Sequence, residues 1–369
     1  MTFDKNSILH KTLARALSMK RPHNSEGTRR LTDWLQANAP AHAKVHRDAV
    51  GNLHIDTRTT PNNRTLFTAH VDTVHRDQGP NKIRKTATHW HADGACLGAD
   101  DGAGCAMLMH LLHSGVAAYY LFTQGEECGG IGATFVAKDA EFLKQFDRAI
   151  AFDRRGIDSV ITHQGWSRTA SDAFAEALAN DLCADLTLMY SPDDTGVYTD
   201  TAEFIDVIPE CTNISVGYAR EHSEEESLDL LHFAALAARV VLIDWDGLPT
   251  DRDPKVIDSK YGAFGNDWMA SAWPTSVKSS SARGHYFVDD DEWARDELRE
   301  ALNEARMGYK SYLVELMCES VWPEDPEMAE HFIDKDKIDD AVLDQALRDS
   351  AAFDPDVVMA YMFDQVYKG

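Results

Sequence analysis

Five side chains that can bind metal ions stand just after predicted strands or at the start of a predicted helix. They are His70, Asp100, Glu127, Asp153 and His222, separated by 30, 27, 26 and 69 residues. Carboxylate oxygens combined with two imidazoles suit Zn²⁺, Mn²⁺ or Co²⁺, and one Asp can bridge two ions roughly 3.5–4 Å apart. Because open α/β sheets bind ligands at the carboxyl ends of their strands, this ordered set predicts a two-metal site there.

Two further carboxylates stand beside these candidates. Asp72 lies two residues after His70, where it could receive the second imidazole N–H and fix the tautomer that a metal requires. Glu126 directly precedes Glu127, so one glutamate could bind metal while the other takes a proton. Taken singly, a His-x-Asp pair can equally be structural, and paired glutamates can be a solvated loop. The prediction therefore depends on the ordered set.

Alternating strands and helices must position these residues. Strands are predicted over 65–69, 117–123, 149–153, 159–163, 186–190 and 213–216, and helices over 8–17, 28–37, 102–113, 132–143, 168–180 and 224–243. Such alternation is typical of an α/β fold. We expect a three-layer α/β/α sandwich with a mixed, largely parallel central sheet.

The charge and texture of the chain change near residue 245. Residues 1–245 carry a net charge of −10, whereas residues 246–369 carry −15 in about half the length. We expect a catalytic domain over 1–245, an irregular connector over 246–285 and an acidic α-helical C-terminal region over 286–369. This last region is either a solvated cap on the catalytic domain or a docking surface for an oligomer or a basic partner.

The composition of the whole chain excludes some classes of partner. Its 369 residues include 36 basic and 61 acidic side chains, and a net charge of −25 argues against binding to nucleic acid. No apolar run of about 18 residues is present, so we expect no contact with a membrane. The six cysteines lie far apart and the N-terminal residues lack the pattern of a secretion signal. Both features are typical of a cytoplasmic protein.

Five sequence stretches carry a resemblance to a known group of enzymes. Between residues 65 and 223 the chain contains LFTAHVDTV, LGADDGAG, FTQGEECGG, AFD and ISVGYAREHS. Together they resemble the co-catalytic di-zinc exopeptidase clan, which includes peptidase T, the glutamate carboxypeptidases and the bacterial leucyl aminopeptidases. The resemblance implies two divalent metal ions as cofactors, with zinc first and cobalt or manganese as alternatives.

The resemblance also implies a role for each candidate residue. His70 would be a terminal ligand of one metal and Asp153 a terminal ligand of the other. Glu127 and His222 would complete the two sites, and Asp100 would bridge them. Asp72 would orient His70. Glu126 would be the general base that takes a proton from a water held between the two metals. The implied reaction is hydrolysis of a small peptide, and a homo-oligomer is a further expectation of the resemblance.

Two departures bear on the substrate. Gly102 follows the paired aspartates, where peptidase T-like sequences usually have Lys. The gaps of 30 and 69 residues before Asp100 and His222 are too short for the inserted lid or dimerisation domain of the carboxypeptidase-like members. In lidded relatives that domain commonly contributes groups that bind a substrate carboxylate. The compact form therefore favours recognition of a free α-amino group by acidic residues.

The leading hypothesis is a metal-dependent aminopeptidase that hydrolyses the N-terminal peptide bond. Asp200 and Tyr198 are candidates for substrate contact, or the Tyr hydroxyl for help to an oxyanion, with local turn packing as the alternative. A deacylase, dipeptidase or carboxypeptidase-like amidohydrolase of the same clan is the first alternative function. The second is a non-catalytic metal-binding scaffold that acts through its acidic tail. Glu126 argues against the scaffold, because a retired enzyme has no need for a base beside its metal.

Overall fold

The computed structural model describes residues 6–165, 167–184 and 187–256. The acidic helical region predicted over 286–369 and most of the predicted connector lie outside the described residues, so the predicted domain boundaries stay predictions. Within the described part, no helix is both long enough and apolar enough to cross a lipid bilayer.

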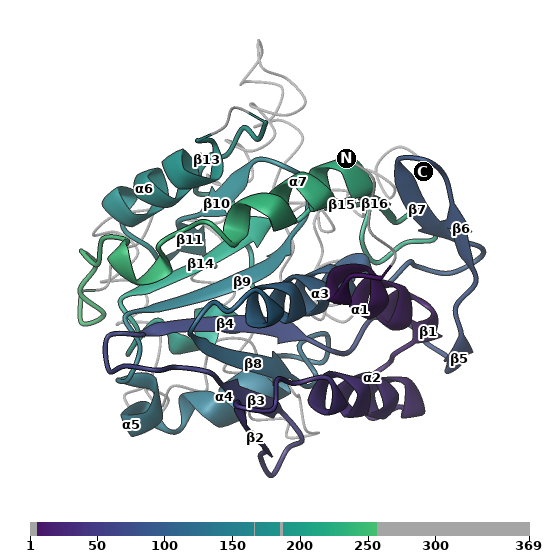
Figure 1. Ribbon diagram of the computed structural model, residues 1–369, viewed down its shortest axis with the longest axis horizontal. Coiled ribbons are helices and arrows are strands. Elements are labelled where there is room, and N and C mark those ends of the chain that lie inside the picture. Colours follow the sequence, from purple (N-terminus) through teal and green to yellow (C-terminus); the bar gives the residue numbers. More distant parts are fainter. Residues whose placement is uncertain (1–5, 166, 185–186, 257–369) are drawn as a thin grey trace, which may run out of the picture. The chain divides into compact units, whose positions relative to one another are not determined.

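An eight-stranded mixed sheet forms the centre of the described part (Figure 1). Its spatial order is β13 (Ser191–Asp193), β10 (Ser159–Ile161), β14 (Glu210–Ser215), β9 (Arg148–Arg154), β4 (Thr65–His70), β8 (Tyr119–Thr123), β3 (Leu53–Asp56) and β2 (Lys44–Arg47). The four strands β14, β9, β4 and β8 are parallel, and β3 and β2 continue the sheet in antiparallel pairing. This confirms the predicted mixed, largely parallel sheet.

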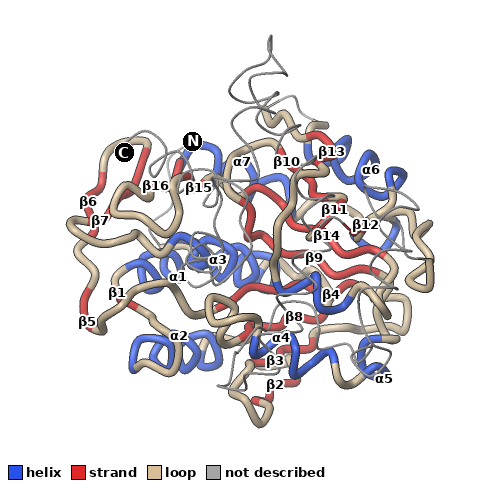
Figure 2. Tube along the Cα trace, turned by 180° about the vertical axis from the view of Figure 1, so that it is seen from behind, coloured by secondary structure: helices blue, strands red, loops and turns tan. Residues whose placement is uncertain are grey.

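Helices cover both faces of this sheet, so the fold has the three predicted layers (Figures 1 and 2). One layer contains α1 (Ile8–Leu17), α3 (Ala99–His113), α6 (Asp172–Leu182) and α7 (Leu230–Val240), with α2 (Glu26–Ala37) beside α1. The opposite layer contains α4 (Ile131–Ala137), α5 (Ala140–Leu143) and the short 3₁₀ helix η1 (Asp200–Phe204). Strands β4 and β8 are buried along their whole length, as expected for strands covered on both faces.

Short strands and one further 3₁₀ turn surround this core. A four-stranded sheet is formed by β15 (Tyr218–Ala219), β16 (Ser227–Asp229), β7 (His89–Ala92) and β6 (Ile83–Lys85). Two-stranded pairs join β1 (Met19–Lys20) with β5 (Gly79–Pro80) and β11 (His163–Gln164) with β12 (Ser167–Arg168), and η2 spans Trp245–Gly247. The small four-stranded sheet matters for the site, because the loop between β15 and β16 carries His222.

The central helix α3 explains how one of the site residues is held. Apart from His110 and His113, all of its residues are buried, which is the composition of a helix enclosed by protein on every side. It packs against β4 and β9 on one side and α1 on another. Its first turn, which contains Asp100, is therefore fixed at the carboxyl edge of the sheet.

Some predicted elements differ from the structure. The helix predicted over 224–243 begins only at Leu230, because residues 227–229 pair with β7 and the Asp229 carboxylate caps the new helix. The helix predicted over 168–180 begins at Asp172, capped by Ser171. The strand predicted over 186–190 was wrong for its described residues: Leu188 and Tyr190 are buried, but the strand itself follows at Ser191.

The chain beyond α7 packs back onto the sheet. The Arg148 side chain donates hydrogen bonds to the Leu248 carbonyl at 3.1 Å and to the Thr250 hydroxyl at 2.9 Å. The backbone N–H groups of Asp251 and Arg252 donate to the Glu210 carboxylate at 2.7 and 3.0 Å. These contacts attach residues 248–252 to the first residues of β9 and β14.

A buried histidine near the site predicts a pH dependence of stability. His75 is 7% exposed, with Nδ1 accepting from the Thr73 hydroxyl at 2.6 Å and Nε2 donating to the Cys96 carbonyl at 3.0 Å. Burial, with a smaller effect of nearby Arg21, lowers the pKa of His75 to about 4. Between the ordinary pKa of about 6.5 and this value, the unfolded chain binds the proton better, so stability is lost as pH falls through that window.

We therefore expect His75 to reduce the free energy of unfolding by about 2 kcal/mol between roughly pH 7 and pH 5. In His75→Gln the amide can keep both hydrogen bonds without titrating, so this share of the pH dependence should disappear. Urea unfolding of the metal-free protein at both pH values measures it. The exposed His42→Gln is the control, and equal pH dependence of the wild type and His75→Gln would refute the assignment.

Candidate active site

The five predicted metal-binding side chains meet at the carboxyl edge of the parallel strands. His70 is the last residue of β4, Asp153 is next to last in β9, and Glu127 follows the end of β8 by four residues. Asp100 is the second residue of α3, and His222 lies in the loop between β15 and β16. Separate elements therefore deliver the five side chains to one place, as the sequence predicts.

Asp100 lies at the centre of the cluster, between two imidazoles. Its Oδ1 is 3.0 Å from His70 Nε2, and its Oδ2 is 3.1 Å from His222 Nε2. On the first side, His70 Nε2 is 3.6 Å from Asp153 Oδ1. On the second side, His222 Nε2 is 3.2 Å from Glu127 Oε2. The cluster therefore consists of two groups of ligand atoms that share one aspartate.

This grouping corrects one detail of the role assignment. The resemblance placed His70 and Asp153 on different metals, whereas the structure places them in the same group. The reason is the order of the strands. Thr68 of β4 pairs directly with Ala151 of β9, so two residues further along both strands end side by side. Sequence spacing cannot show which strands are neighbours in the sheet.

Among the described residues, the cluster is most exposed to solvent at His222. The side chains of His70, Asp153 and Glu127 are 2%, 6% and 8% exposed, whereas that of His222 is 51% exposed. His222 also has a positive φ of 62°, which turns the loop back towards the sheet. A substrate would therefore approach the cluster from the side of His222.

Glu126 lies beside the ligand atoms. Its Oε2 is 3.9 Å from His70 Nε2, and its side chain is 11% exposed. Burial, together with the negative charges of Asp153 and Glu127, raises the pKa of Glu126 well above its ordinary value. A carboxyl group with a raised pKa close to the reacting position is suited to proton transfer at neutral pH.

Asp72 acts on more of the site than predicted. His70 Nδ1 is 3.2 Å from the backbone carbonyl of Asp72 and 3.7 Å from its carboxylate, so the carbonyl is the nearer acceptor for the imidazole. The Asp72 carboxylate instead accepts the backbone N–H groups of Gly125, Glu126 and Glu127 at 2.8, 3.2 and 3.3 Å. The turn at Gly125, with φ of 73°, directs these three donors towards one side chain. Asp72 therefore positions both glutamates.

Two hydroxyl groups that were not among the predicted site residues donate hydrogen bonds to Asp153. Thr199 Oγ1 donates to Asp153 Oδ2 at 2.7 Å, and the Tyr218 hydroxyl donates to Oδ1 at 3.1 Å. Such partners orient a carboxylate and tune its affinity for a metal. Nothing in the local sequence distinguishes these residues from ordinary Thr and Tyr, because both lie far from Asp153 along the chain.

Asp200 and Tyr198 lie close to the cluster and each makes one side-chain hydrogen bond, while Asp200 Oδ1 is buried without a partner among the described residues. Asp200 is 2% exposed and accepts a hydrogen bond from the Thr123 hydroxyl at the end of β8. Burial raises the pKa of Asp200 to about 7. The Tyr198 hydroxyl donates to Glu203 at 3.1 Å. It also lies so close to Gly130 that a Cβ on this residue would overlap it. Their role in substrate contact stays a prediction.

The residues present fit a pair of divalent cations. Two imidazoles and three carboxylates form a donor set that suits zinc. Glu127 Oε1 is buried and has no hydrogen-bond partner among the described residues, as expected of an atom reserved for a ligand. Burial and the nearby Asp100 charge raise the pKa of Glu127 to about 7 and also raise the pKa of Asp153. A bound cation would relieve this repulsion.

The neighbouring Asp101 is a further carboxylate within reach. Ligand atoms of His70, Asp101 and Asp153 lie within 4.8 Å of one another, as do those of His70, Asp100 and Glu127. Asp101 is fully buried, and its carboxylate accepts the backbone N–H groups of His70 at 3.2 Å and Gly104 at 2.8 Å. These bonds join the end of β4 to the start of α3. Asp101 therefore holds the end of β4, which carries His70, next to the start of α3, which carries Asp100.

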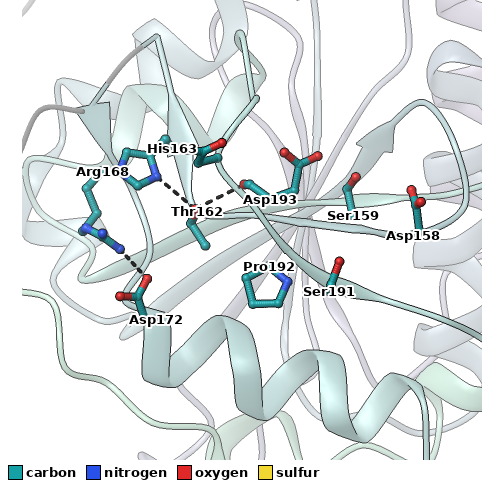
Figure 3. Close-up of a pocket in the computed structure, with 10 residues that line it drawn as sticks. Asp158, Ser159, Thr162, His163, Arg168, Asp172, Ser191, Pro192 and Asp193 are labelled. Carbon is teal, nitrogen blue, oxygen red and sulfur yellow. Dashed lines mark hydrogen bonds and ion pairs between the residues drawn. The ribbon is translucent and has the colours of Figure 1, made fainter. Parts of the chain in front are cut away.

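A separate cavity of about 490 Å³ lies at the β10–β13 edge of the sheet (Figure 3). Several of its polar groups bond to each other: Thr162 to His163 at 2.9 Å, and Arg168 to Asp172 at 2.7 Å. The lining does not include any of the five predicted ligands. We therefore assign the chemistry to the cluster around Asp100 and not to this cavity.

Comparisons with known proteins agree with the fold. Residues 52–229 match the sequence profile of peptidase family M28. A comparison with curated proteins finds no match. The structure is similar to aminopeptidase PepT from Bacillus cereus, with 15% identity and a TM-score of 0.55, covering 64% of this chain and 97% of that one.

Two further solved structures share the fold. A tripeptidase from Staphylococcus aureus has 16% identity and a TM-score of 0.53, covering 65% of this chain and 98% of that one. The TET1 peptidase of Pyrococcus horikoshii has 15% identity and a TM-score of 0.50, covering 63% and 98%. The matched range includes all five cluster residues and also Glu126. Residues 52–229 therefore match a peptidase M28 domain, and the described part of the chain shares the fold of these solved peptidases.

Proposed function

We propose that this protein is a metal-dependent aminopeptidase that hydrolyses the N-terminal peptide bond of small peptides. The observation that supports the proposal most strongly is the position of Asp100. Its two oxygens face His70 at 3.0 Å and His222 at 3.1 Å, which is the arrangement needed for one carboxylate to serve two metals. Glu126 stands beside this arrangement as a proton acceptor.

Each residue of the cluster has a role in the proposal. His70 and Asp153 would hold one cation, Glu127 and His222 would hold the other, and both would share Asp100. Two divalent cations supply Lewis acidity, which polarises a carbonyl group and makes water more acidic. Glu126 accepts the proton of the attacking water on its carboxylate and passes it to the leaving amine. Asp72 keeps Glu126 in place through the backbone of the 125–127 turn.

The preference for a free amino terminus is the finer part of the proposal. Acidic side chains surround the site, and negative charge attracts the cationic amine of an unblocked peptide. Arg155, a cation on the side where the cluster opens, is paired with Glu221 at 3.3 Å, which disfavours its use as a carboxylate-binding group. The Bacillus cereus and Staphylococcus aureus neighbours are described as an aminopeptidase and a tripeptidase, which supports this choice.

The proposal includes zinc as the natural metal, with cobalt or manganese as replacements, and a homo-oligomer as the assembly. The donor set supports zinc. The TET1 peptidase of Pyrococcus horikoshii assembles into a tetrahedron or an octahedral shell, which supports an oligomer. The cytoplasmic location and the non-catalytic scaffold, which depends on residues outside the described part, stay predictions of the sequence.

A metal-replacement experiment tests the proposal. The protein is stripped with a chelator, dialysed and reloaded with Zn²⁺, Co²⁺ or Mn²⁺, and each sample is given a tripeptide amide. Bound metal is measured in the same samples, and the products are identified by mass spectrometry. We expect no hydrolysis without metal and release of only the first residue with it. Hydrolysis by the stripped protein, or release of another fragment first, would overturn the proposal.

A further inference from the structure

The backbone turn that places Asp100 is held by a buried glutamate from a distant part of the chain. The Glu226 carboxylate accepts the backbone N–H groups of Gly98 at 2.8 Å, Ala99 at 2.7 Å and Asp100 at 3.1 Å. The Glu226 side chain is buried, at 1% exposure, whereas the adjacent Glu224 and Glu225 are exposed. Three hydrogen bonds donated to one carboxylate fix the direction in which Asp100 leaves the turn.

A buried arginine holds the other side of the same turn. Arg21 is fully buried, and its Nη2 donates to the Gly98 carbonyl at 2.9 Å. Its Nε donates to the Val71 carbonyl at 2.9 Å, and its Nη1 donates to the Ala16 carbonyl. Arg21 therefore connects the turn before Asp100 to the residue that follows His70. The guanidinium meets all these acceptors in a fixed planar geometry, which an amine cannot reproduce.

The space for Arg21 depends on small residues. A Cβ built on Gly102 would lie 3.2 Å from Arg21 Nη2 and 3.1 Å from Leu17 Cδ2. A Cβ on Gly98 would lie 3.4 Å from Arg21 Nη1, and Gly98 has a φ of 74°, where other residues are strained. Gly102 is one of the departures from peptidase T-like sequences. Its lack of a side chain leaves room for the cation of Arg21.

We propose that Glu226 is a positioning residue for Asp100. Arg21 has the same role through a different contact with the Gly98–Asp100 turn. Glu226 fixes the N–H groups of the turn, and Arg21 fixes its Gly98 carbonyl and the end of β4. Together they aim the two Asp100 oxygens at His70 and His222. The inference rests on the proposed function, because it gives the pair a part in binding the metals that the function requires.

Zinc binding by Glu226→Gln tests the proposal directly. Glutamine has one acceptor oxygen and an NH₂ group that would face the backbone donors, so the turn cannot keep all three hydrogen bonds. We expect zinc affinity to fall about tenfold to a hundredfold, measured by competition with a chromophoric chelator and zinc alone as the probe. With zinc saturating, kcat should fall while KM changes little, since Asp100 is misplaced but the peptide contacts remain.

Two other variants make the result specific. Glu225→Gln changes an exposed neighbour that is paired with Arg220 at 2.7 Å, and it should bind zinc as the wild type does. Arg21→Lys keeps the charge but loses the fork of donors, and it should lower zinc affinity in the same direction by a smaller factor. Circular dichroism and thermal unfolding of the metal-free proteins show whether each variant folds.

The outcomes separate this proposal from the proposed function. Zinc affinity unchanged in Glu226→Gln would overturn the positioning role. If Glu226→Gln does not fold, unchanged affinity in a folded Arg21→Lys would overturn it. A wild type that binds zinc but hydrolyses no peptide would overturn the proposed function alone. Lower zinc affinity in the two variants, with Glu225→Gln normal, supports the positioning role in either case.

Discussion

Replacing Glu126 by glutamine should remove almost all hydrolysis while both metal ions stay bound. General base catalysis contributes roughly 10²–10⁴-fold, so kcat should fall by about that factor. The fold should be little changed, because burial already favours the neutral form of Glu126 in the metal-free protein and glutamine has the same shape. Steady-state hydrolysis of a tripeptide amide and metal analysis of the same samples measure both effects.

The control for this prediction is an ordinary surface glutamate. Glu141 is exposed and pairs with Lys144 at 2.6 Å, so Glu141→Gln should keep full activity. If Glu126→Gln kept more than about a tenth of the wild-type kcat, Glu126 would not be the base. Loss of metal together with activity would instead show that Glu126 is a ligand.

Replacing Asp100 by asparagine should disrupt both metal positions at once. Although burial opposes its ionisation, the imidazoles of His222 and His70 hold the pKa of Asp100 well below its ordinary value. An amide presents only one oxygen and no charge, so it cannot serve both groups. We expect bound zinc to fall from two ions per chain to one at most. Hydrolysis should fall by about a thousandfold or more, which corresponds to roughly 4 kcal/mol.

Metal analysis after equilibrium dialysis against buffered zinc measures this second prediction. The metal-free Asp100→Asn protein should also lose about 1–3 kcal/mol of unfolding free energy, because two charge-assisted hydrogen bonds are removed, one to buried His70 and one to half-exposed His222. Asp93→Asn, an exposed carboxylate paired with Lys82 at 2.9 Å, is the control. Two zinc ions still bound to Asp100→Asn would show that Asp100 does not bridge the groups.

The parts of the fold that the sequence predicts are those with strong local signals. Strands β4 and β8 are continuous apolar runs, and a buried sheet is the structure such runs adopt. The predicted ligands follow these runs directly, so their meeting at the carboxyl edge could be inferred from order alone. The helix predicted over 132–143 shows the limit. Asp139 caps a new helix and splits the segment in two, and the apolar pattern continues across the break.

Other features depend on which segments become neighbours, and no local pattern records this. His70 and Asp153 share a group because β4 and β9 are adjacent. Glu226 binds the backbone of Asp100, which lies 126 residues away in the sequence. It belongs to a run of acidic residues, and such a run is typical of a solvated surface. Burial separates Glu226 from its neighbours in that run, and only the folded structure shows burial.

A comparison of two substrates shows whether the site cleaves peptides from a free amino end. The zinc-loaded protein is given the same tripeptide amide in its free and N-acetylated forms, with and without chelator. Our account predicts hydrolysis of the free form only, and none once the chelator is present. Hydrolysis of the acetylated form at a comparable rate would contradict the proposed aminopeptidase and would favour a deacylase activity at the same cluster.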